Sequence, residues 1–139
     1  MKNIIIKTIF IFTYMFLSYQ VNANYIFVSN ENSDTITILN SSDKKIAKTI
    51  KTGGRPRDMK FSLDKKFLYV VVSEENHIAV VNLKKLEIVE YLETGDDPEI
   101  FDISPDGSLI AVSNEDDNEL TLINLEKRKK FKVLKNIGV

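Results

Sequence analysis

Cysteine is missing from this chain of 139 residues, and histidine occurs once, as His77. The absence of cysteine excludes disulfide bridges, thiolate metal sites and cysteine nucleophiles. A single histidine likewise excludes a metal site built from several histidines of this chain. The sequence therefore predicts no metal site and no bound cofactor.

An excess of charge of one sign is also missing. The chain carries 19 basic and 20 acidic side chains, for a formal net charge of −1. No uniform basic field is present that would hold a nucleic acid, so we expect no nucleic-acid partner. The 43% of hydrophobic and 28% of charged residues are instead typical of a soluble globular protein with one modest core.

Residues 1–23 have the layout of a secretory signal peptide. Lys2 and Lys7 provide a positive start, Thr8–Ser18 is an apolar run, and the stretch that ends at Ala23 offers small residues for cleavage. A membrane anchor needs about 20 apolar residues, and this run is shorter. We therefore expect a periplasmic or secreted protein without membrane contact after cleavage. Loss of the two lysines leaves 17 basic against 20 acidic side chains, a net charge of −3.

The rest of the chain repeats itself with a period of 42 residues. An apolar segment begins at Phe27 and returns at Tyr69 and at Ala111, 42 residues later each time. The same shift, without a gap, relates Asn40, Asn82 and Asn124, and it relates Gly53, Pro56, Ser62 and Asp64 to Gly95, Pro98, Ser104 and Asp106. A register that holds strands and turn residues together indicates an internal repeat rather than chance similarity.

Each repeat is expected to contain four short strands, most clearly in the middle copy. There we expect strands at Arg57–Ser62, Phe67–Val72, His77–Asn82 and Glu87–Leu92. The second and third strands are almost continuously apolar, which is typical of strands covered on both faces. The fourth alternates as a half-solvated strand does. A unit of about 40 residues with four strands is typical of a propeller blade, so the predicted fold class is all-β, a β-propeller of four-stranded antiparallel blades.

The repeat divides the exported part of the chain into about three blades. Residues 24–56 are expected to form a first blade that lacks its first strand, 57–98 a second blade and 99–139 a third. A propeller closes with about four to eight blades, so we interpret the sequence as the N-terminal fragment of a larger propeller. The two outermost blades would then expose apolar faces, and we expect the truncated chain to associate with itself through them.

Three segments carry a family resemblance. Tyr25–Asn30, Phe67–Val72 and Leu109–Asn114 are each followed by an Ile/Val-rich or Leu-rich strand that ends in asparagine. In this they resemble the YVTN-type β-propeller repeat proteins. The Ser-Pro-Asp-Gly turn of that family is present at Ser104–Gly107 and is altered to Ser-Leu-Asp-Lys at Ser62–Lys65.

A narrower resemblance lies in residues 95–107 and 114–118. They read Gly-Asp-Asp-Pro-Glu-Ile-Phe, then Ser-Pro-Asp-Gly, then Asn-Glu-Asp-Asp-Asn, and they are similar to the periplasmic propeller proteins associated with PQQ-dependent alcohol catabolism. The resemblance covers residues 24–139. It implies seven blades when the propeller is complete, a periplasmic location, and a link to quinoprotein dehydrogenase systems without a catalytic role of the propeller itself.

Charge is expected to segregate between the two ends of the blades. The loops between blades, and those between second and third strands, emerge at one end, which we call the acidic end. Its acidic residues are Glu31, Asp34, Glu74, Glu75, Asp96, Asp97, Glu99, Glu115, Asp116 and Asp117. Its only basic residues are Arg55 and Arg57, whereas lysines dominate the opposite, basic end. The acidic end is expected to attract a basic protein partner or a small cationic ligand; the alternative is that charged loops segregate without a function.

Four other features of the sequence resemble functional sites. Arg55 and Arg57 follow a glycine pair and suggest an anion contact, but no helix follows to strengthen it. Glu115–Asp117 lacks the ligand spacing of an EF-hand loop and indicates a solvated turn. His77 stands at an ordinary strand position, and the basic run Lys127–Lys130 is interpreted as a solvated turn.

No set of residues in the sequence supports catalysis. The leading hypothesis is therefore a non-catalytic binding or scaffold protein, accessory to PQQ-dependent alcohol oxidation, and the accessory role rests on resemblance alone. Two alternatives stay open. The chain belongs to a propeller enzyme whose catalytic or cofactor residues lie in missing blades, or to a structural or adhesive protein of the cell surface.

Overall fold

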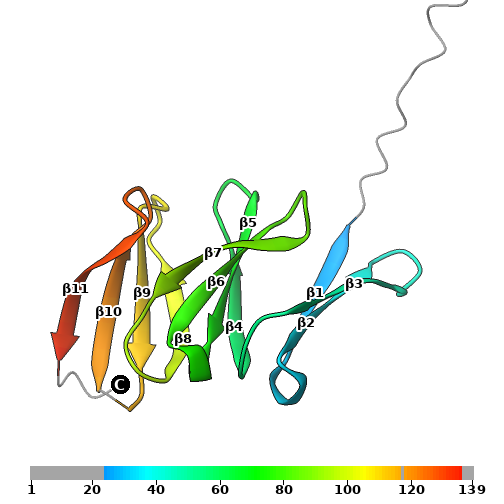
Figure 1. Ribbon diagram of the computed structural model, residues 1–139. Helices are drawn as coiled ribbons and strands as arrows, with labels where there is room; N and C mark the ends of the chain where they lie inside the picture. The colour runs from blue at the N-terminus through cyan, green and yellow to red at the C-terminus, as the bar shows by residue number, and fades with distance from the viewer. Residues whose placement is uncertain (1–23, 117, 136–139) are drawn as a thin grey trace, which may run out of the picture.

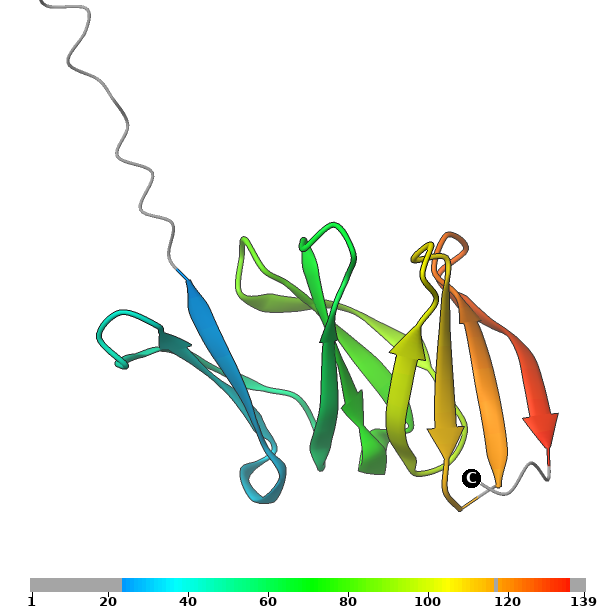
Figure 2. The ribbon, with the colours of Figure 1, turned by 180° about the vertical axis from the view of Figure 1, so that it is seen from behind.

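The computed structural model describes residues 24–116 and 118–135. In these residues eleven strands form three antiparallel sheets, in each of which the strands follow one another in chain order. The sheets stand side by side like the blades of a fan (Figures 1 and 2). This arrangement confirms the predicted all-β propeller fold, with about three blades present. No helix in the described ranges has the length and apolar character needed to cross a membrane.

The three blades share one plan. Blade 1 contains β1 (Tyr25–Asn30), β2 (Thr35–Asn40) and β3 (Ile46–Lys51). Blade 2 contains β4 (Pro56–Phe61), β5 (Phe67–Val72), β6 (His77–Asn82) and β7 (Glu87–Glu93). Blade 3 contains β8 (Pro98–Ile103), β9 (Leu109–Asn114), β10 (Glu119–Asn124) and β11 (Lys129–Lys135). Two single-turn 3-10 helices, η2 (Glu31–Ser33) and η3 (Ser73–Glu75), follow β1 and β5.

Blade 2 shows how well the strand limits were predicted. β5 and β6 have the predicted limits, and β7 continues one residue further, to Glu93. β4 is shifted by one residue and begins at Pro56. A proline is tolerated at the first residue of a strand, because its missing N–H is not needed by the ladder there. The two 3-10 turns were not predicted.

Irregularities of the backbone recur with the period of the sequence. A bulge interrupts the pairing of the third and fourth strands after Ile38, Val80 and Leu122, which lie 42 residues apart. The turn before the fourth strand contains a residue with positive φ in every blade, namely Lys44 (61°), Leu86 (54°) and Arg128 (56°). Bulges are specific features of a sheet rather than defects, so the three blades are copies of one unit in backbone as well as in sequence.

Asn40, Asn82 and Asn124 occupy the same place in the three blades, the end of the third strand. The side-chain oxygen of each accepts a hydrogen bond from a backbone N–H two or three residues later, at 3.1, 3.0 and 2.7 Å. Such a bond folds the chain back on itself as a backbone turn would. The repeated asparagine therefore directs the chain into the fourth strand.

The core lies in two seams between neighbouring blades. In the seam between blades 1 and 2, Ile36, Ile38 and Ile50 face Leu68, Val70, Val72, Ala79 and Val81. In the seam between blades 2 and 3, Tyr69, Val71, Ile78, Val80 and Leu92 face Phe101, Ile110, Val112 and Ile123. Successive side chains of a strand point to opposite faces, so β5 and β6 supply both seams. Blade 2 is thus buried on both sides, as its apolar strands predicted.

Among the described residues, blades 1 and 3 are covered by another blade on one face only. Burial alternates along β1, β2, β9 and β10. On the outer face of blade 1, Ile26 and Val28 are 40% and 39% exposed, and Ile100 of blade 3 is 63% exposed. The fourth strand β7 is half-solvated, and its exposed side carries the apolar residues Val89 and Tyr91.

Candidate functional site

The loops of the acidic end are hydrogen-bonded to one another across the blades. The backbone N–H of Thr52, between blades 1 and 2, donates to the carbonyl of Asp34 at 2.9 Å. In the next blade, Thr94 donates in the same way to Asn76 at 3.1 Å. The hydroxyl of Ser73 also donates to the carbonyl oxygen of Pro98 in blade 3, at 2.6 Å. The loops therefore form a row of fixed geometry.

Side chains of Asp34 and Asn76 hold the loop that enters the following blade. Oδ1 of Asp34 accepts the backbone N–H of Arg55 at 3.2 Å, and Oδ1 of Asn76 accepts that of Asp97 at 3.1 Å. All four residues have positive φ, between 47° and 57°. Asparagine and aspartate adopt this region more readily than other residues, which accounts for their place at the end of η2 and η3.

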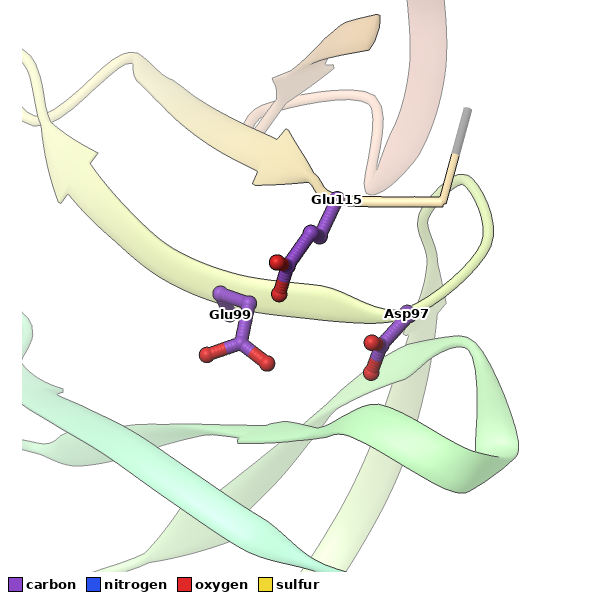
Figure 3. Close-up of side chains that lie close together, drawn as sticks. All are labelled: Asp97, Glu99 and Glu115. Carbon is purple, nitrogen blue, oxygen red and sulfur yellow. The ribbon is translucent and has the colours of Figure 1, made fainter. Parts of the chain in front are cut away.

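Three carboxylates converge at the start of blade 3. Atoms of Asp97, Glu99 and Glu115 lie within 4.8 Å of one another, one from each side chain (Figure 3). Oxygen ligands in such a group suit a hard cation such as Ca²⁺. The sequence placed these residues at the acidic end but did not predict that they converge.

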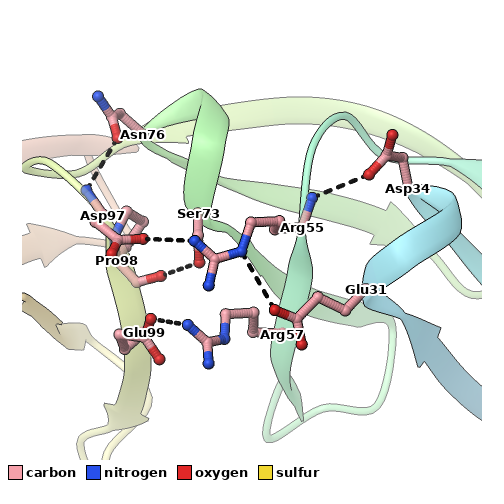
Figure 4. A network of polar contacts seen from close by, with 9 residues as sticks. All are labelled: Glu31, Asp34, Arg55, Arg57, Ser73, Asn76, Asp97, Pro98 and Glu99. Atoms are coloured by element: carbon pink, nitrogen blue, oxygen red, sulfur yellow. Dashed lines mark hydrogen bonds and ion pairs between the residues drawn. The ribbon is translucent and has the colours of Figure 1, made fainter.

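Arg55 and Arg57 extend across the acidic end and pair with its carboxylates (Figure 4). Nε of Arg55 donates to Oε1 of Glu31 at 3.2 Å, and its Nη1 lies 3.8 Å from Oδ1 of Asp97. Arg57 forms an ion pair with Glu99. The hydrogen bond to Glu31 raises the pKa of Arg55 above its ordinary value. Both guanidinium groups thus bind carboxylates of the same chain, which differs from the open anion contact suggested by the sequence.

An open depression of about 330 Å³ lies between the loops of blades 2 and 3. It is lined by Arg55, Ser73, Glu74, Asn76, Asp96, Asp97 and Asp116. Four carboxylates therefore surround one guanidinium group, which itself pairs with Glu31 and Asp97. The depression is negatively charged, and its chemistry suits a cation rather than an anion.

Glycines make room for the acidic side chains of η3. A Cβ atom at Gly53 would lie 2.8 Å from Cγ of Glu75, and one at Gly54 would lie 2.9 Å from Cβ of Glu74. Such distances are too short for unbonded carbon atoms, so the loop needs glycine here.

Of the ten predicted acidic residues, Asp117 lies outside the described residues.

His77 is held by packing at the start of β6. Its ring meets that of Tyr91 edge to face, with 4.4 Å between the centroids. Burial lowers the pKa of His77, and its Nε2 atom is buried without a hydrogen-bond partner in the described part of the chain. The neutral form of the imidazole is therefore favoured.

At the basic end, two equivalent turns keep their carboxylates ionised. Oγ of Ser62 donates to Asp64 at 2.7 Å, and Oγ of Ser104 donates to Asp106 at 2.6 Å. These hydrogen bonds lower the pKa of each aspartate to about 2. The altered turn in blade 2 thus has the structure of the intact turn in blade 3.

Arg128 lies within the predicted solvated run of basic residues but is not free. Its Nε donates to Oε2 of Glu90 in β7 at 2.7 Å, and its guanidinium group lies 5.5 Å from the ring centroid of Phe67. Arg128 therefore joins the basic end of blade 3 to blade 2.

Comparison with known proteins agrees with the propeller fold. A family model described as YNCE-like beta-propeller matches residues 11–139. The chain belongs to the YNCE-like beta-propeller family. No curated protein matches this chain by sequence.

Solved structures share the fold of this YNCE-like chain at low sequence identity. Hydrazine synthase of Kuenenia stuttgartiensis is 22% identical with a TM-score of 0.75; the match covers 82% of this chain and 33% of that chain. Dihydro-heme d1 dehydrogenase NirN is 20% identical with a TM-score of 0.70, covering 81% and 24%. A functionally unknown protein from Desulfotomaculum acetoxidans is 18% identical with a TM-score of 0.70, covering 83% and 39%. The chain thus spans between a quarter and two fifths of these chains.

The sequence repeat of this YNCE-like chain could have predicted the ion pairs that Arg55 and Arg57 form with Asp97 and Glu99. Arg55 and Asp97 are equivalent positions 42 residues apart, and so are Arg57 and Glu99. Neighbouring blades of a propeller place equivalent residues side by side. Opposite charges at equivalent positions of adjacent repeats therefore predict ion pairs between blades, which sorting the charges by end alone does not reveal.

Proposed function

We propose that this chain forms part of an exported propeller that acts as a binding or scaffold module and recognises a cationic group at its acidic end. The group is a lysine or arginine side chain of a basic partner protein, or a small organic amine. The observation that carries this proposal is the depression between blades 2 and 3, where Glu74, Asp96, Asp97 and Asp116 surround Arg55.

Two properties of the depression support binding. Its backbone is fixed by the hydrogen bonds that Asn76 and Ser73 make to the entry of blade 3, so little ordering would accompany binding. Glu74 and Asp116 lie exposed at its rim, where an approaching cation meets them first. Exposed carboxylates of one sign raise the rate of encounter with a cation.

We further propose a periplasmic or secreted location and an accessory role in PQQ-dependent alcohol oxidation. The location rests on the leader-like residues 1–23, and the role rests on the resemblance of residues 95–107 and 114–118. In this role the propeller binds a protein component of the oxidising system and carries no cofactor itself.

A second candidate is a propeller enzyme whose catalytic residues lie in blades other than the three described. Two of the structural neighbours are named as a synthase and a dehydrogenase, which favours this second candidate. Absorbance bands of a haem or quinone cofactor that copurifies with the protein would support the enzyme.

The binding proposal is tested with a fluorescently labelled tetralysine peptide as the probe. Fluorescence anisotropy is measured at about 10 mM and about 150 mM ionic strength, where the Debye length is about 30 Å and about 8 Å. The test variant carries Asp96→Asn and Asp116→Asn; an asparagine at position 96 can still accept the hydrogen bond from Asn76. We expect affinity to fall between about twofold and about 30-fold at low salt, from about 0.2–1 kcal/mol for each exposed ion pair.

The matched control makes the same change of charge at the basic end. It carries Asp43→Asn and Glu126→Gln, both exposed, and we expect its affinity for the probe to equal that of the unmodified chain. Equal weakening in the two variants would show that the peptide responds to net charge alone. That result, or binding insensitive to salt, would contradict a site at the depression.

A further inference from the structure

Blades 2 and 3 border a hollow at the basic end, away from the depression of the acidic end. Its volume is about 300 Å³, at the lower limit of the range of about 300–1,000 Å³ for pockets that bind small molecules. One wall is the turn after β4, and the other is the turn after β8. These two turns approach closely, because a Cβ atom at Gly107 would lie 2.9 Å from Cδ1 of Leu63. All walls of the hollow belong to blades 2 and 3.

The interior of the hollow is apolar. The rings of Phe67 and Tyr69 line it, together with the aliphatic side chains of Leu63, Ile103 and Leu125. Tyr69 belongs to the core of the seam between blades 2 and 3, and Phe67, Ile103 and Leu125 pack against that core. The seam therefore holds these side chains in place. An apolar group that enters the hollow leaves water for a surface that is already formed.

The sequence departs from its own repeat at two positions that line this hollow. Forty-two residues before Ile103 stands Phe61, whose ring meets that of Phe27 at 5.8 Å between the centroids. Forty-two residues before Gly107 stands Lys65, whose Nζ lies 5.2 Å from the centroid of the Phe61 ring. The smaller side chains of blade 3 leave open the space that Phe61 and Lys65 occupy in the seam between blades 1 and 2.

Three charged residues line the hollow, and two of them are already paired. Arg128 forms an ion pair with Glu90, and Oδ2 of Asp64 lies 3.0 Å from Nζ of Lys66. Asp106 is exposed on the opposite wall and forms no ion pair with a described residue. The charge that remains in the hollow is therefore negative.

The carboxylate of Asp106 is fixed and has an oxygen to spare. Oγ of Ser104, together with the backbone N–H and Oγ of Ser108, forms hydrogen bonds that all end on Oδ1 of Asp106. Oδ2 can therefore accept a hydrogen bond from a ligand. The same hydrogen bonds lower the pKa of Asp106 to about 2, so the group is ionised at neutral pH.

We propose that this hollow binds a small organic ammonium ion, with its apolar body between the two blades and its ammonium group against Asp106. The body is an aromatic ring or a short aliphatic chain, which matches the interior formed by Phe67, Ile103 and Leu125. The positive group matches the one carboxylate of the hollow that has no ion pair with a described residue. The site is separate from the depression of the acidic end and does not depend on cation recognition there.

The test is a titration followed by two-dimensional NMR of the backbone amides, with three probes that share a phenyl ring on a short chain. Phenylethylamine carries an ammonium group, phenylethanol a hydroxyl group and phenylpropanoate a carboxylate. We expect the amine to shift the amides of Gly107 and Leu125, with the weak, millimolar affinity of a small ligand. The alcohol should bind about two- to fivefold more weakly, as expected for the loss of one exposed ion pair, and the carboxylate more weakly still.

Asp106→Asn removes the charge and keeps an oxygen that can hold the turn. Its affinity for the amine should fall about two- to fivefold, to the affinity of the alcohol. Asp43→Asn is the matched control. It makes the same change at an exposed carboxylate of the basic end, in a turn of blade 1 where Oδ1 also accepts a backbone N–H, from Lys45 at 3.1 Å. Its affinity for the amine should equal that of the unmodified chain.

Ile103→Phe tests the hollow itself, because it introduces the side chain that stands at the equivalent position 61. The new ring should fill the hollow and abolish the shifts that the probes cause at Gly107 and Leu125, while the spectrum shows that the chain is folded. Undiminished binding to this folded variant would overturn the proposal. So would equal affinities for the amine and the carboxylate, equal effects of the two asparagine variants, or the absence of any shift at Gly107 and Leu125.

The variant with Asp96→Asn and Asp116→Asn separates this site from the acidic end. The amine should shift the amides of Gly107 and Leu125 in that variant with unchanged affinity. If its shifts instead lie in the loops of the acidic end and disappear in that variant, the amine is a ligand of the acidic end and the hollow is not its site. Failure of the tetralysine peptide to bind would leave the result at the hollow unchanged, so the two proposals fail separately.

Discussion

Blades 1 and 2 follow one repeat, yet only blade 2 is buried on both faces. In β5 the residues from Leu68 to Val72 are at most 3% exposed, whereas Ile26 and Val28 of β1 remain 40% and 39% exposed. The first four side chains of β1, Tyr-Ile-Phe-Val, are about as apolar as those of β5, Phe-Leu-Tyr-Val, so the difference at these positions arises from the neighbouring sheets. A blade of this chain is stabilised mainly by the blades beside it, as in other repeat proteins with contacts between nearest neighbours.

The difference between a covered and an uncovered face is tested most sharply by the same substitution at equivalent positions of two blades. Val28 and Val112 lie 84 residues apart on the same face of blades 1 and 3, and Val112 is fully buried. Val112→Ala should lower the free energy of unfolding by about 2–3 kcal/mol, from two lost carbon atoms at about 0.8 kcal/mol each and the cavity that remains. Val28→Ala should lower it by about 1 kcal/mol or less, because a large part of its surface is in water already.

Both variants are measured by urea denaturation against the unmodified chain. Equal losses of stability at the two positions would show that the faces of blades 1 and 3 are equally covered, and would contradict stabilisation by neighbouring blades.

A smaller effect is expected where two copies of one turn carry different residues. Lys65 and Gly107 are equivalent and have φ values of 56° and 73°. Gly107→Ala should lower the free energy of unfolding by about 1–2 kcal/mol, because the left-handed region is unfavourable for alanine and the new Cβ would lie 2.9 Å from Cδ1 of Leu63.

Lys65→Ala is the matched variant, because its backbone already accommodates a Cβ atom at this φ. Its expected cost is about 0.5–1 kcal/mol, from the exposed contact between Lys65 and the ring of Phe61. Thermal denaturation of the two variants compares the turns directly. A larger loss at position 65 than at position 107 would contradict a steric and conformational need for glycine in the intact turn.

The strands and turns of each repeat could be predicted because residues close together in the sequence determine them. The limits of β5 and β6, and the common turns after Asn40, Asn82 and Asn124, follow from residues within a few positions of one another. The bulges between third and fourth strands leave no comparable mark in the pattern of residue types.

The candidate site was predicted only in outline, because its geometry depends on how blades stand beside one another. Sorting loops by end assigned the acidic residues to one end, but it treated Arg55 and Arg57 as open to a ligand. Their pairing with Glu31, Asp97 and Glu99 requires contacts between different blades. The convergence of Asp97, Glu99 and Glu115 depends instead on the pairing of β8 with β9 within blade 3, which brings together residues that are up to 18 positions apart in the sequence.

Hydrogen exchange measured strand by strand tests most directly whether the blades are stabilised by their neighbours. We expect the amides of β5 and β6 to exchange most slowly, at rates close to those of global unfolding. The amides of β1 and β2 should exchange faster, through opening of blade 1 alone. Exchange in β1 as slow as that in β5 would contradict this expectation, because a sheet covered on one face would then be as stable as a sheet covered on two.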